Sequence, residues 1–240
     1  MKTTTTLLTG LFLAVTAARA DIITQWNFNS DPTDANTGTG VTTPAFGAGT
    51  IITVGGATNP SFNAGAGSSD PEATDNSGYQ TTTYPAAGVG NKTAGIEFAV
   101  STLGFSGIQI SFDSRHSNTS ANTLRLQYSV DGSTFLDSAQ FTFTPAPTGT
   151  GDTWFNARST DLSAITGLDN NANAKFRVVT EFDPGLGDYL AARSTSVYGG
   201  GTLRYDMITV SGVPAAVPEP ATAGLIGLGL ALLRLSRRRR

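Results

Sequence analysis

Apolar and polar residues alternate one by one along three stretches in the middle of the chain. The stretches are residues 96–101, 108–113 and 124–131. A period of two places successive side chains on opposite faces of a strand, so each stretch predicts a β-strand with one buried face. The core positions predicted from this pattern and from a later strand are Phe98, Ile110, Leu126 and Phe176.

The remaining sequence also favours strands and turns over helices. Further strands are predicted at residues 24–28, 135–143, 176–182 and 203–210. Residues 29–75 are mostly Gly, Thr, Ala, Asn and Pro, which predicts long loops with one or two short strands, with a disordered segment as the alternative. Only Asp161–Leu168 suggests a short helical turn. We therefore predict one all-β domain over residues 21–213, an antiparallel β-sandwich or jelly roll.

In the last predicted strand, the apolar residues switch from one face of the strand to the other partway along it. By period two, Tyr205 and Met207 share one face, whereas Ile208 and Val210 share the other. Such a change requires either burial on both faces or one extra residue, a β-bulge, near Met207. The pattern alone leaves both possibilities open.

The first 20 residues have the three parts of a secretory signal peptide. Lys2 supplies the positive start, Leu7–Val15 is a short apolar run, and Ala18-Arg19-Ala20 resembles a cleavage site. The apolar run is shorter than the roughly 20 residues that span a bilayer as a helix. Residues 1–20 are therefore predicted to be a signal peptide, with the mature chain beginning at Asp21.

The C-terminal residues 214–240 combine a proline-rich break, an apolar run and a cluster of positive charges. Pro218 and Pro220 flank Glu219 and cannot continue a strand or a helix. Ala221–Leu233 carries no charge. In physical terms this is a stop-transfer segment, a short hydrophobic transmembrane helix whose arginines stay on the cytoplasmic side of the inner membrane. Those closing residues are Arg237, Arg238, Arg239 and Arg240.

Pro218-Glu219-Pro220, the apolar run and the terminal arginines resemble, in this order, the PEP-CTERM sorting signal of Gram-negative bacteria. The resemblance implies recognition by an exosortase-type membrane protease, with processing near the Pro-Glu-Pro and a transient stage in the inner membrane. It also implies delivery to the cell envelope, the outer surface or the extracellular polysaccharide matrix. An ordinary tail anchor is the alternative.

The predicted domain is acidic and contains no cysteine. Between residues 21 and 217 there are 17 acidic and 8 basic residues, a net charge of −9. Such a surface repels phosphate backbones, which argues against nucleic acid as a partner, and it is compatible with divalent cations or neutral glycans. Without cysteine the chain has no disulfide, no thiolate nucleophile and no Cys-bound zinc.

Three motifs in the predicted domain resemble the galactose-binding-like jelly-roll domains that are common in PEP-CTERM proteins. They are Trp26-Asn27-Phe28, Gln127–Gly132 and Arg204–Val210. The resemblance implies a binding or structural module more often than an enzyme. Such domains often hold a structural calcium between their first and last strands. Here a calcium would draw on Asn27, Asn29 and Asp206, whose side chains carry the oxygen ligands that Ca²⁺ prefers.

Catalytic groups are few in this sequence, and no catalytic residue is predicted. His116 is the only histidine and follows a predicted strand in a polar loop, where a solvated or hydrogen-bonded histidine is expected. No G-x-S-x-G elbow occurs. Four acids on or near strands could form a hydrolytic carboxylate pair, but solvent-facing positions are expected for them. They are Glu97, Asp113, Glu181 and Asp206.

Trp154, which lies between Asp152 and Asn156, is the best single candidate for stacking on a sugar ring. The alternative is that it closes one end of the sandwich. The leading functional hypothesis is a non-enzymatic protein of the cell surface or extracellular matrix, sorted by its tail. The second hypothesis is a carbohydrate-binding module that attaches to exopolysaccharide, and the third is a secreted hydrolase.

Overall fold

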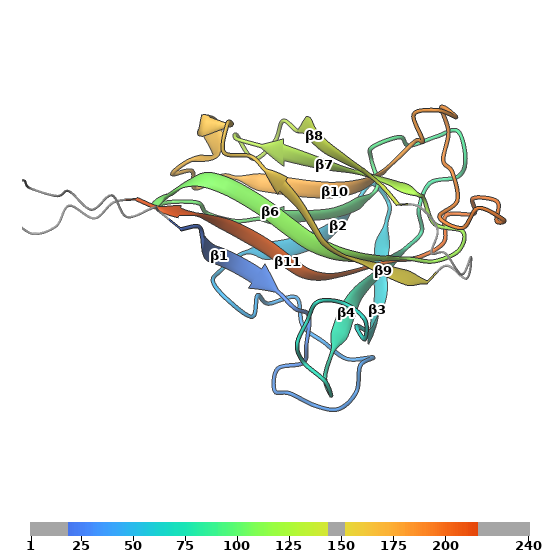
Figure 1. Cartoon of the computed structure of the whole chain (residues 1–240), viewed down its shortest axis with the longest axis horizontal. Coiled ribbons are helices and arrows are strands. Elements are labelled where there is room, and N and C mark those ends of the chain that lie inside the picture. Colours follow the sequence, from blue (N-terminus) through green and yellow to red (C-terminus); the bar gives the residue numbers. More distant parts are fainter. Residues whose placement is uncertain (1–18, 144–151, 216–240) are drawn as a thin grey trace, which may run out of the picture.

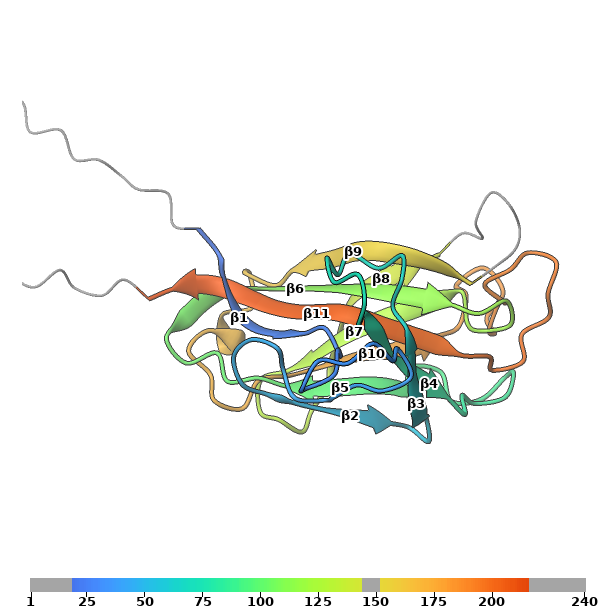
Figure 2. The ribbon, with the colours of Figure 1, turned by 90° about the horizontal axis from the view of Figure 1, so that it is seen from below.

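The computed structural model describes residues 19–143 and 152–215. Within these ranges the chain forms eleven strands and one short 3₁₀ helix. The strands make two antiparallel sheets that pack face to face (Figures 1 and 2). The structure therefore confirms the predicted all-β sandwich of jelly-roll type. Most of the predicted signal peptide and nearly all of the predicted sorting tail lie outside the described residues.

One layer, called sheet A here, has six strands. Their order is β3-β4-β11-β6-β9, and β1 pairs with β11 in addition. The strands are β1 (Asp21–Trp26), β3 (Thr58–Ala64), β4 (Ser77–Thr82), β6 (Phe105–His116), β9 (Thr153–Asp161) and β11 (Leu203–Pro214).

The second layer, called sheet B here, has five strands in the order β2-β5-β10-β7-β8. The short helix η1 (Thr166–Leu168) lies within the stretch for which a helical turn was predicted. The stretch 29–75 holds β2 and β3 between long loops, as predicted. The strands of sheet B are β2 (Thr50–Val54), β5 (Gly95–Ala99), β7 (Thr123–Ser129), β8 (Leu136–Thr142) and β10 (Lys175–Glu181).

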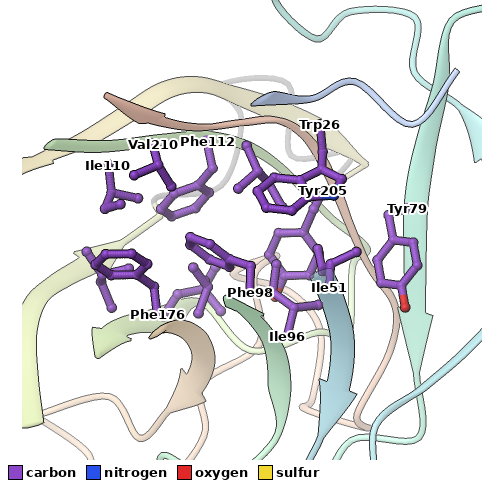
Figure 3. Close-up of a cluster of buried hydrophobic side chains, with 14 of the residues drawn as sticks. Trp26, Ile51, Tyr79, Ile96, Phe98, Ile110, Phe112, Phe176, Tyr205 and Val210 are labelled. Atoms are coloured by element: carbon purple, nitrogen blue, oxygen red, sulfur yellow. The ribbon is translucent and has the colours of Figure 1, made fainter. Parts of the chain in front are cut away.

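The apolar core lies between the two sheets, as the alternation in the sequence requires. Ile110, Phe112 and Val210 of sheet A point toward Phe98 and Phe176 of sheet B (Figure 3). The rings of Phe98 and Phe176 stack with their centroids 5.5 Å apart. All four predicted core residues are buried, which confirms the predicted faces of these strands. They are Phe98, Ile110, Leu126 and Phe176.

Strand β11 contains the irregularity that its sequence suggested. Its register against β6 shifts between Asp206 and Thr209, and Met207 has a positive φ of 47°. The extra residue returns Ile208 to the core face that already carries Tyr205, and both side chains are fully buried. The predicted bulge near Met207 is therefore present, and the strand is also buried on both faces, since Arg204, Asp206 and Thr209 are buried as well.

β1 and β4 share one edge of β11. β4 pairs with residues 203–205 of β11, and β1 pairs with residues 208–212. Asp206 and Met207 lie between these two pairings, where the ladder on this edge is interrupted. Side chains must therefore satisfy the backbone around the bulge, because buried amide groups need hydrogen-bond partners.

Candidate functional site

The hairpin loop between β3 and β4, residues 65–76, covers part of the outer face of sheet A. Beneath it Asp113 of β6 and Asp206 of β11 are direct cross-strand partners. Their exposed fractions are 1% and 0%. The expectation that these two acids face solvent is therefore wrong, because the loop folds over the face that alternation assigned to water.

Asp113 is held by backbone amides from two directions. One oxygen accepts the N–H of Ser69 in the hairpin loop at 2.5 Å, and the other accepts the N–H of Ala157 in β9 at 2.7 Å. Ala157 has a positive φ of 51° and lies where the register between β6 and β9 is irregular. The carboxylate thus replaces the ladder partner that the irregularity removes.

Asp206 has the same kind of neutral partners but is more deeply affected by burial. It accepts the hydroxyl of Ser68 at 2.6 Å and the N–H of Met207 at 2.7 Å. Burial is the main reason that the pKa of Asp206 is raised to about 8. The two hydrogen bonds lower the pKa, whereas the charges of Asp70 and Asp113 raise it. Asp206 therefore carries a proton through most of the neutral range.

The three predicted calcium ligands, Asn27, Asn29 and Asp206, lie along one hydrogen-bonded chain. The N–H of Asn29 donates to Asn27 at 3.4 Å, and the Asn29 amide donates to Asp70 at 2.9 Å. The N–H of Asp70 donates to Ser68, which donates to Asp206. Among the described residues no group of three Asp, Glu, His or Cys side chains is placed to hold a metal ion. A calcium ion here stays a prediction.

A pocket of about 330 Å³ opens at the end of β1, beside Asn27 and Asn29 of this hydrogen-bonded series. Asn27 and Asn29 line it, and Asp206 does not. Its walls come from the loops after β1 and before β4, which the sequence showed only as polar, glycine-rich stretches. The acidic residues in its wall are Asp31, Glu72 and Asp75.

A row of four side chains crosses the outer face of sheet A. Gln80, Arg204, Arg115 and Trp154 are successive cross-strand partners on β4, β11, β6 and β9. Arg204 donates to Gln80 at 3.0 Å, and Arg115 pairs with Asp152 at 3.3 Å. Burial, followed by the neighbouring charge of Arg115, lowers the pKa of Arg204 to about 10. The row therefore places two guanidinium groups beside an indole.

Trp154, the predicted sugar-binding residue, lies on β9 and is partly exposed. It is the second residue of β9, opposite Arg115 near the end of β6. Gly67 and Gly78 lie against two edges of the indole, where a Cβ would come within 2.9 and 3.3 Å of it. The indole Nε1 is buried and has no hydrogen-bond partner among the described residues. Its role in sugar binding stays a prediction.

His116 is not in a polar loop but is the last residue of β6 and is 1% exposed. Its Nδ1 lies 2.9 Å from the carbonyl of Ala121, and its Nε2 lies 3.2 Å from the hydroxyl of Ser114. Its ring packs against Phe143 with the centroids 4.2 Å apart. Burial lowers the pKa of His116 to about 4, so the ring is neutral and structural at physiological pH.

The acids of sheet B are also buried, contrary to the sequence expectation, and they have charged partners. Glu97 pairs with Arg177 at 2.7 Å and with Lys175 at 3.1 Å. Glu181 accepts hydrogen bonds from Nε and Nη2 of Arg125, at 3.0 and 2.7 Å. Glu97 and Glu181 are 6% and 5% exposed. Their oxygens are engaged by cations of the same face, which suits an ion-pair ladder rather than a hydrolytic pair.

Sequence reasoning missed the arginine row and the acidic pocket. Asp113 and Arg115 are two residues apart, as are Arg204 and Asp206, so alternation could have placed each pair on one face. The pairing of β6 with β11, which puts Arg115 opposite Arg204, has no local signal. The pocket has none either, because its walls are irregular loops.

Sequence comparison identifies the segment that follows β11. Residues 216–240 match the PEP-CTERM protein-sorting motif. The match confirms the resemblance based on Pro218-Glu219-Pro220 and the closing arginines. The PEP-CTERM motif indicates an exported protein with a surface or extracellular location, and it implies processing by an exosortase. In the part of the chain that the structure describes, no helix is long and apolar enough to cross a membrane.

Solved structures with a similar arrangement of strands include carbohydrate-binding and adhesin domains. The CBM22-1–CBM22-2 tandem of Paenibacillus barcinonensis Xyn10C has a TM-score of 0.46 and 13% identity over 80% of this chain and 50% of that one. The CBM22-1–GH10 modules of Clostridium thermocellum Xyn10B, complexed with xylohexaose, have a TM-score of 0.43 and 12% identity over 83% and 30%.

An adhesin domain is similar at a lower score. The K1 cleaved adhesin domain of Lys-gingipain from Porphyromonas gingivalis has a TM-score of 0.38 and 13% identity, over 71% of this chain and all of that one. This chain spans half or less of the Xyn10C and Xyn10B chains in these structures. No curated protein matches the sequence.

Proposed function

We propose that this chain is a non-enzymatic protein of the cell surface or extracellular matrix of a Gram-negative bacterium. The observation that carries the proposal is the match of residues 216–240 to the PEP-CTERM motif. In this proposal an exosortase-type protease processes the chain near Glu219 after a transient stage in the inner membrane. The β-sandwich of residues 21–213 is then the part that remains outside the cell.

The surroundings of the buried titratable groups support a non-enzymatic role. His116 is neutral and packed against Phe143. Asp113 binds backbone amides, and Glu97 and Glu181 bind cations within their own sheet. Each of these groups stabilises a strand or a loop, and a general acid or base needs an atom free to meet a substrate.

Fractionation of cells that produce the full chain tests the sorting proposal. Glu219→Ala is expected to leave the chain unprocessed in the inner membrane, which intact mass and membrane fractionation would reveal. Thr222→Ala, a change in the same tail outside the Pro-Glu-Pro, is the matched control and is expected to be processed normally. Normal release of the Glu219→Ala protein would contradict exosortase sorting.

The second candidate function is attachment to exopolysaccharide through the arginine row of sheet A. Trp154 offers a partly exposed aromatic surface, and Arg115 and Arg204 lie next to it in cross-strand order. The Arg115 side chain is 26% exposed, so its guanidinium can donate hydrogen bonds to a molecule bound on this face. Sugar hydroxyl and carboxylate oxygens are acceptors that would complement such donors.

A polysaccharide array probed with the full-length chain in mild detergent tests this candidate. We expect Trp154→Ala and Arg115→Ala each to remove most of the binding. Phe46→Ala, which removes an exposed ring outside the row, is the control and should bind like the parent chain. Equal binding by Trp154→Ala and the parent would remove the row as the sugar site.

A further inference from the structure

Eight of the eleven residues that line the pocket at the end of β1 have oxygen-bearing side chains, and the other three are Val41, Pro44 and Ala45. Its volume of about 330 Å³ lies within the range of small-molecule sites, roughly 300–1,000 Å³. No lysine or arginine is among the residues that line it. The pocket shares no residue with the arginine row, so it is a separate site from the proposed polysaccharide surface.

Asp75 lines the pocket and has one carboxylate oxygen to which no described group donates. The side chain is fully buried, and its Oδ2 accepts the N–H groups of Ser30 and Asp34, each at 3.1 Å. Its Oδ1 is buried and has no hydrogen-bond partner among the described residues. A buried carboxylate oxygen without a donor is costly, so a ligand that donates to Oδ1 would be stabilised strongly.

Two further acids add negative charge at the same wall. Asp31 and Glu72 line the pocket and are exposed. Hydrogen bonds from Thr74 and from the N–H of Ala73 lower the pKa of Glu72, which keeps it ionised. The hydrogen bonds from Ala73 and Thr74 all go to the Oε1 atom of Glu72.

We propose that this pocket binds a protonated amino sugar, with the ammonium group beside Asp75 and the ring hydroxyls on the surrounding amide and hydroxyl groups. An ammonium group has three donors and no acceptor, which complements an acceptor-rich, negatively charged wall. The volume suits a single sugar ring and exceeds the space that a bare ion occupies. Asn27 and Asn29 provide side-chain amides for the hydroxyls.

Titration of the full-length chain with glucosamine at pH 6 tests the proposal. N-acetylglucosamine is the matched ligand, since it has the same ring but no charge. We expect glucosamine to bind at least about tenfold more tightly, because a charge-assisted hydrogen bond replaces a neutral contact. Isothermal calorimetry or ligand-observed NMR would measure both affinities.

Two variants test whether glucosamine binds in this pocket. Asp75→Asn keeps an oxygen for Ser30 and Asp34 but removes the charge, and Asp31→Asn changes an exposed side chain that is not expected to affect folding. Both are expected to weaken glucosamine binding by at least about threefold, with Asp75→Asn the more severe. Asp21→Asn, an exposed change of the same charge elsewhere, should leave it unchanged.

Three results would overturn the proposal. One is equal affinity for glucosamine and N-acetylglucosamine, and another is unchanged glucosamine binding in both Asp75→Asn and Asp31→Asn. The third is binding of Ca²⁺ that Asp75→Asn abolishes, in a chain that does not bind glucosamine. That last result would identify the pocket as a cation site instead.

Discussion

The outer faces of the two sheets both bury carboxylates, but they stabilise them differently. On sheet B, Glu97 and Glu181 are paired with arginine and lysine side chains at 2.7–3.3 Å. On sheet A, Asp113 and Asp206 are held by backbone N–H groups and by the Ser68 hydroxyl. The first face is neutralised by its own cations, whereas the second depends on neutral donors.

This difference explains why sheet A carries the candidate sites. Four of the eight basic residues of the domain lie on or beside sheet B, namely Lys92, Arg125, Lys175 and Arg177. Near the β3–β4 hairpin the acids have no cation partner; burial raises the pKa of Asp206, and Asp75 keeps an oxygen without a donor among the described residues. A carboxylate without a cation partner attracts a cationic ligand more strongly than a carboxylate that is already paired with a cation.

Both faces rest on one apolar core, and truncating it should have the largest effect. Leu126 is fully buried on the inner face of sheet B. Leu126→Ala is expected to lower the free energy of unfolding by about 2–5 kcal/mol, because lost apolar burial adds to the cost of a cavity. Urea denaturation would measure it. A loss below about 0.5 kcal/mol, the range of ordinary surface substitutions, would mean that the strand faces are misassigned.

Removing a cation from sheet B should come next. Arg125→Ala takes the bidentate partner from the buried Glu181 and leaves Lys92 at 3.3 Å and the side-chain amide of Gln140 at 2.9 Å. We expect a loss of about 3 kcal/mol in unfolding free energy, because a buried charge without its partner is strongly destabilising. Arg125→Lys keeps the positive charge and should cost clearly less. Equal losses in the two variants would show that packing of the side chain, not charge, is what matters.

Removing an acid from sheet A should cost less, because its partners are neutral. Asp113→Ala leaves the N–H groups of Ser69 and Ala157 without an acceptor. The expected loss is about 1–3 kcal/mol. Asp113→Asn keeps one acceptor oxygen and should retain more of the stability. If Asn is as damaging as Ala, the charge of Asp113 rather than its hydrogen bonds stabilises the loop.

The pH dependence of stability should reveal the buried Asp206 of sheet A, with a smaller effect than the substitutions above. The pKa of Asp206 rises from 3.8 to about 8, so the native state holds a proton that the unfolded chain releases. Its contribution is complete below about pH 4 and is lost as the pH rises through about 8. The melting temperature of the parent chain should fall between pH 5 and 9 relative to Asp206→Asn.

Parallel pH profiles for the two chains would contradict this assignment. They should be recorded with EDTA present, since a calcium ion at Asp206 would favour the ionised carboxylate and mask the proton. A chain that melts lower in EDTA, with the effect lost in Asp206→Asn, would support the calcium prediction instead.

The placement of the strands could be predicted because it follows from local pattern. The alternation through Ile96–Val100 and Ile108–Phe112 assigned the buried faces correctly, and the parity change at Met207 gave the bulge. The same rule misjudged the outer faces. Alternation tells which side of a strand a residue is on, but it contains no information about what covers that side.

His116, Asp113 and Trp154 illustrate what the pattern could not supply. His116 is buried because Phe143, 27 residues further along the chain, packs against its ring, and the carbonyl of Ala121 lies within hydrogen-bond distance of its Nδ1. Asp113 is buried because the β3–β4 loop folds across β6. Trp154 lies in none of the predicted strands, and its strand is visible only through pairing with β6.

By itself the sequence determined the class of fold, the strand faces and the sorting motif, because each is written in consecutive residues read by a local rule. The tertiary structure alone decided which carboxylates lost their water, which gained cations, and which loops enclose the pocket at Asp75. Those outcomes depend on contacts between segments more than 40 residues apart, such as Ser69 with Asp113 and Ser30 with Asp75. Charge and burial are properties of such contacts, and no periodicity encodes them.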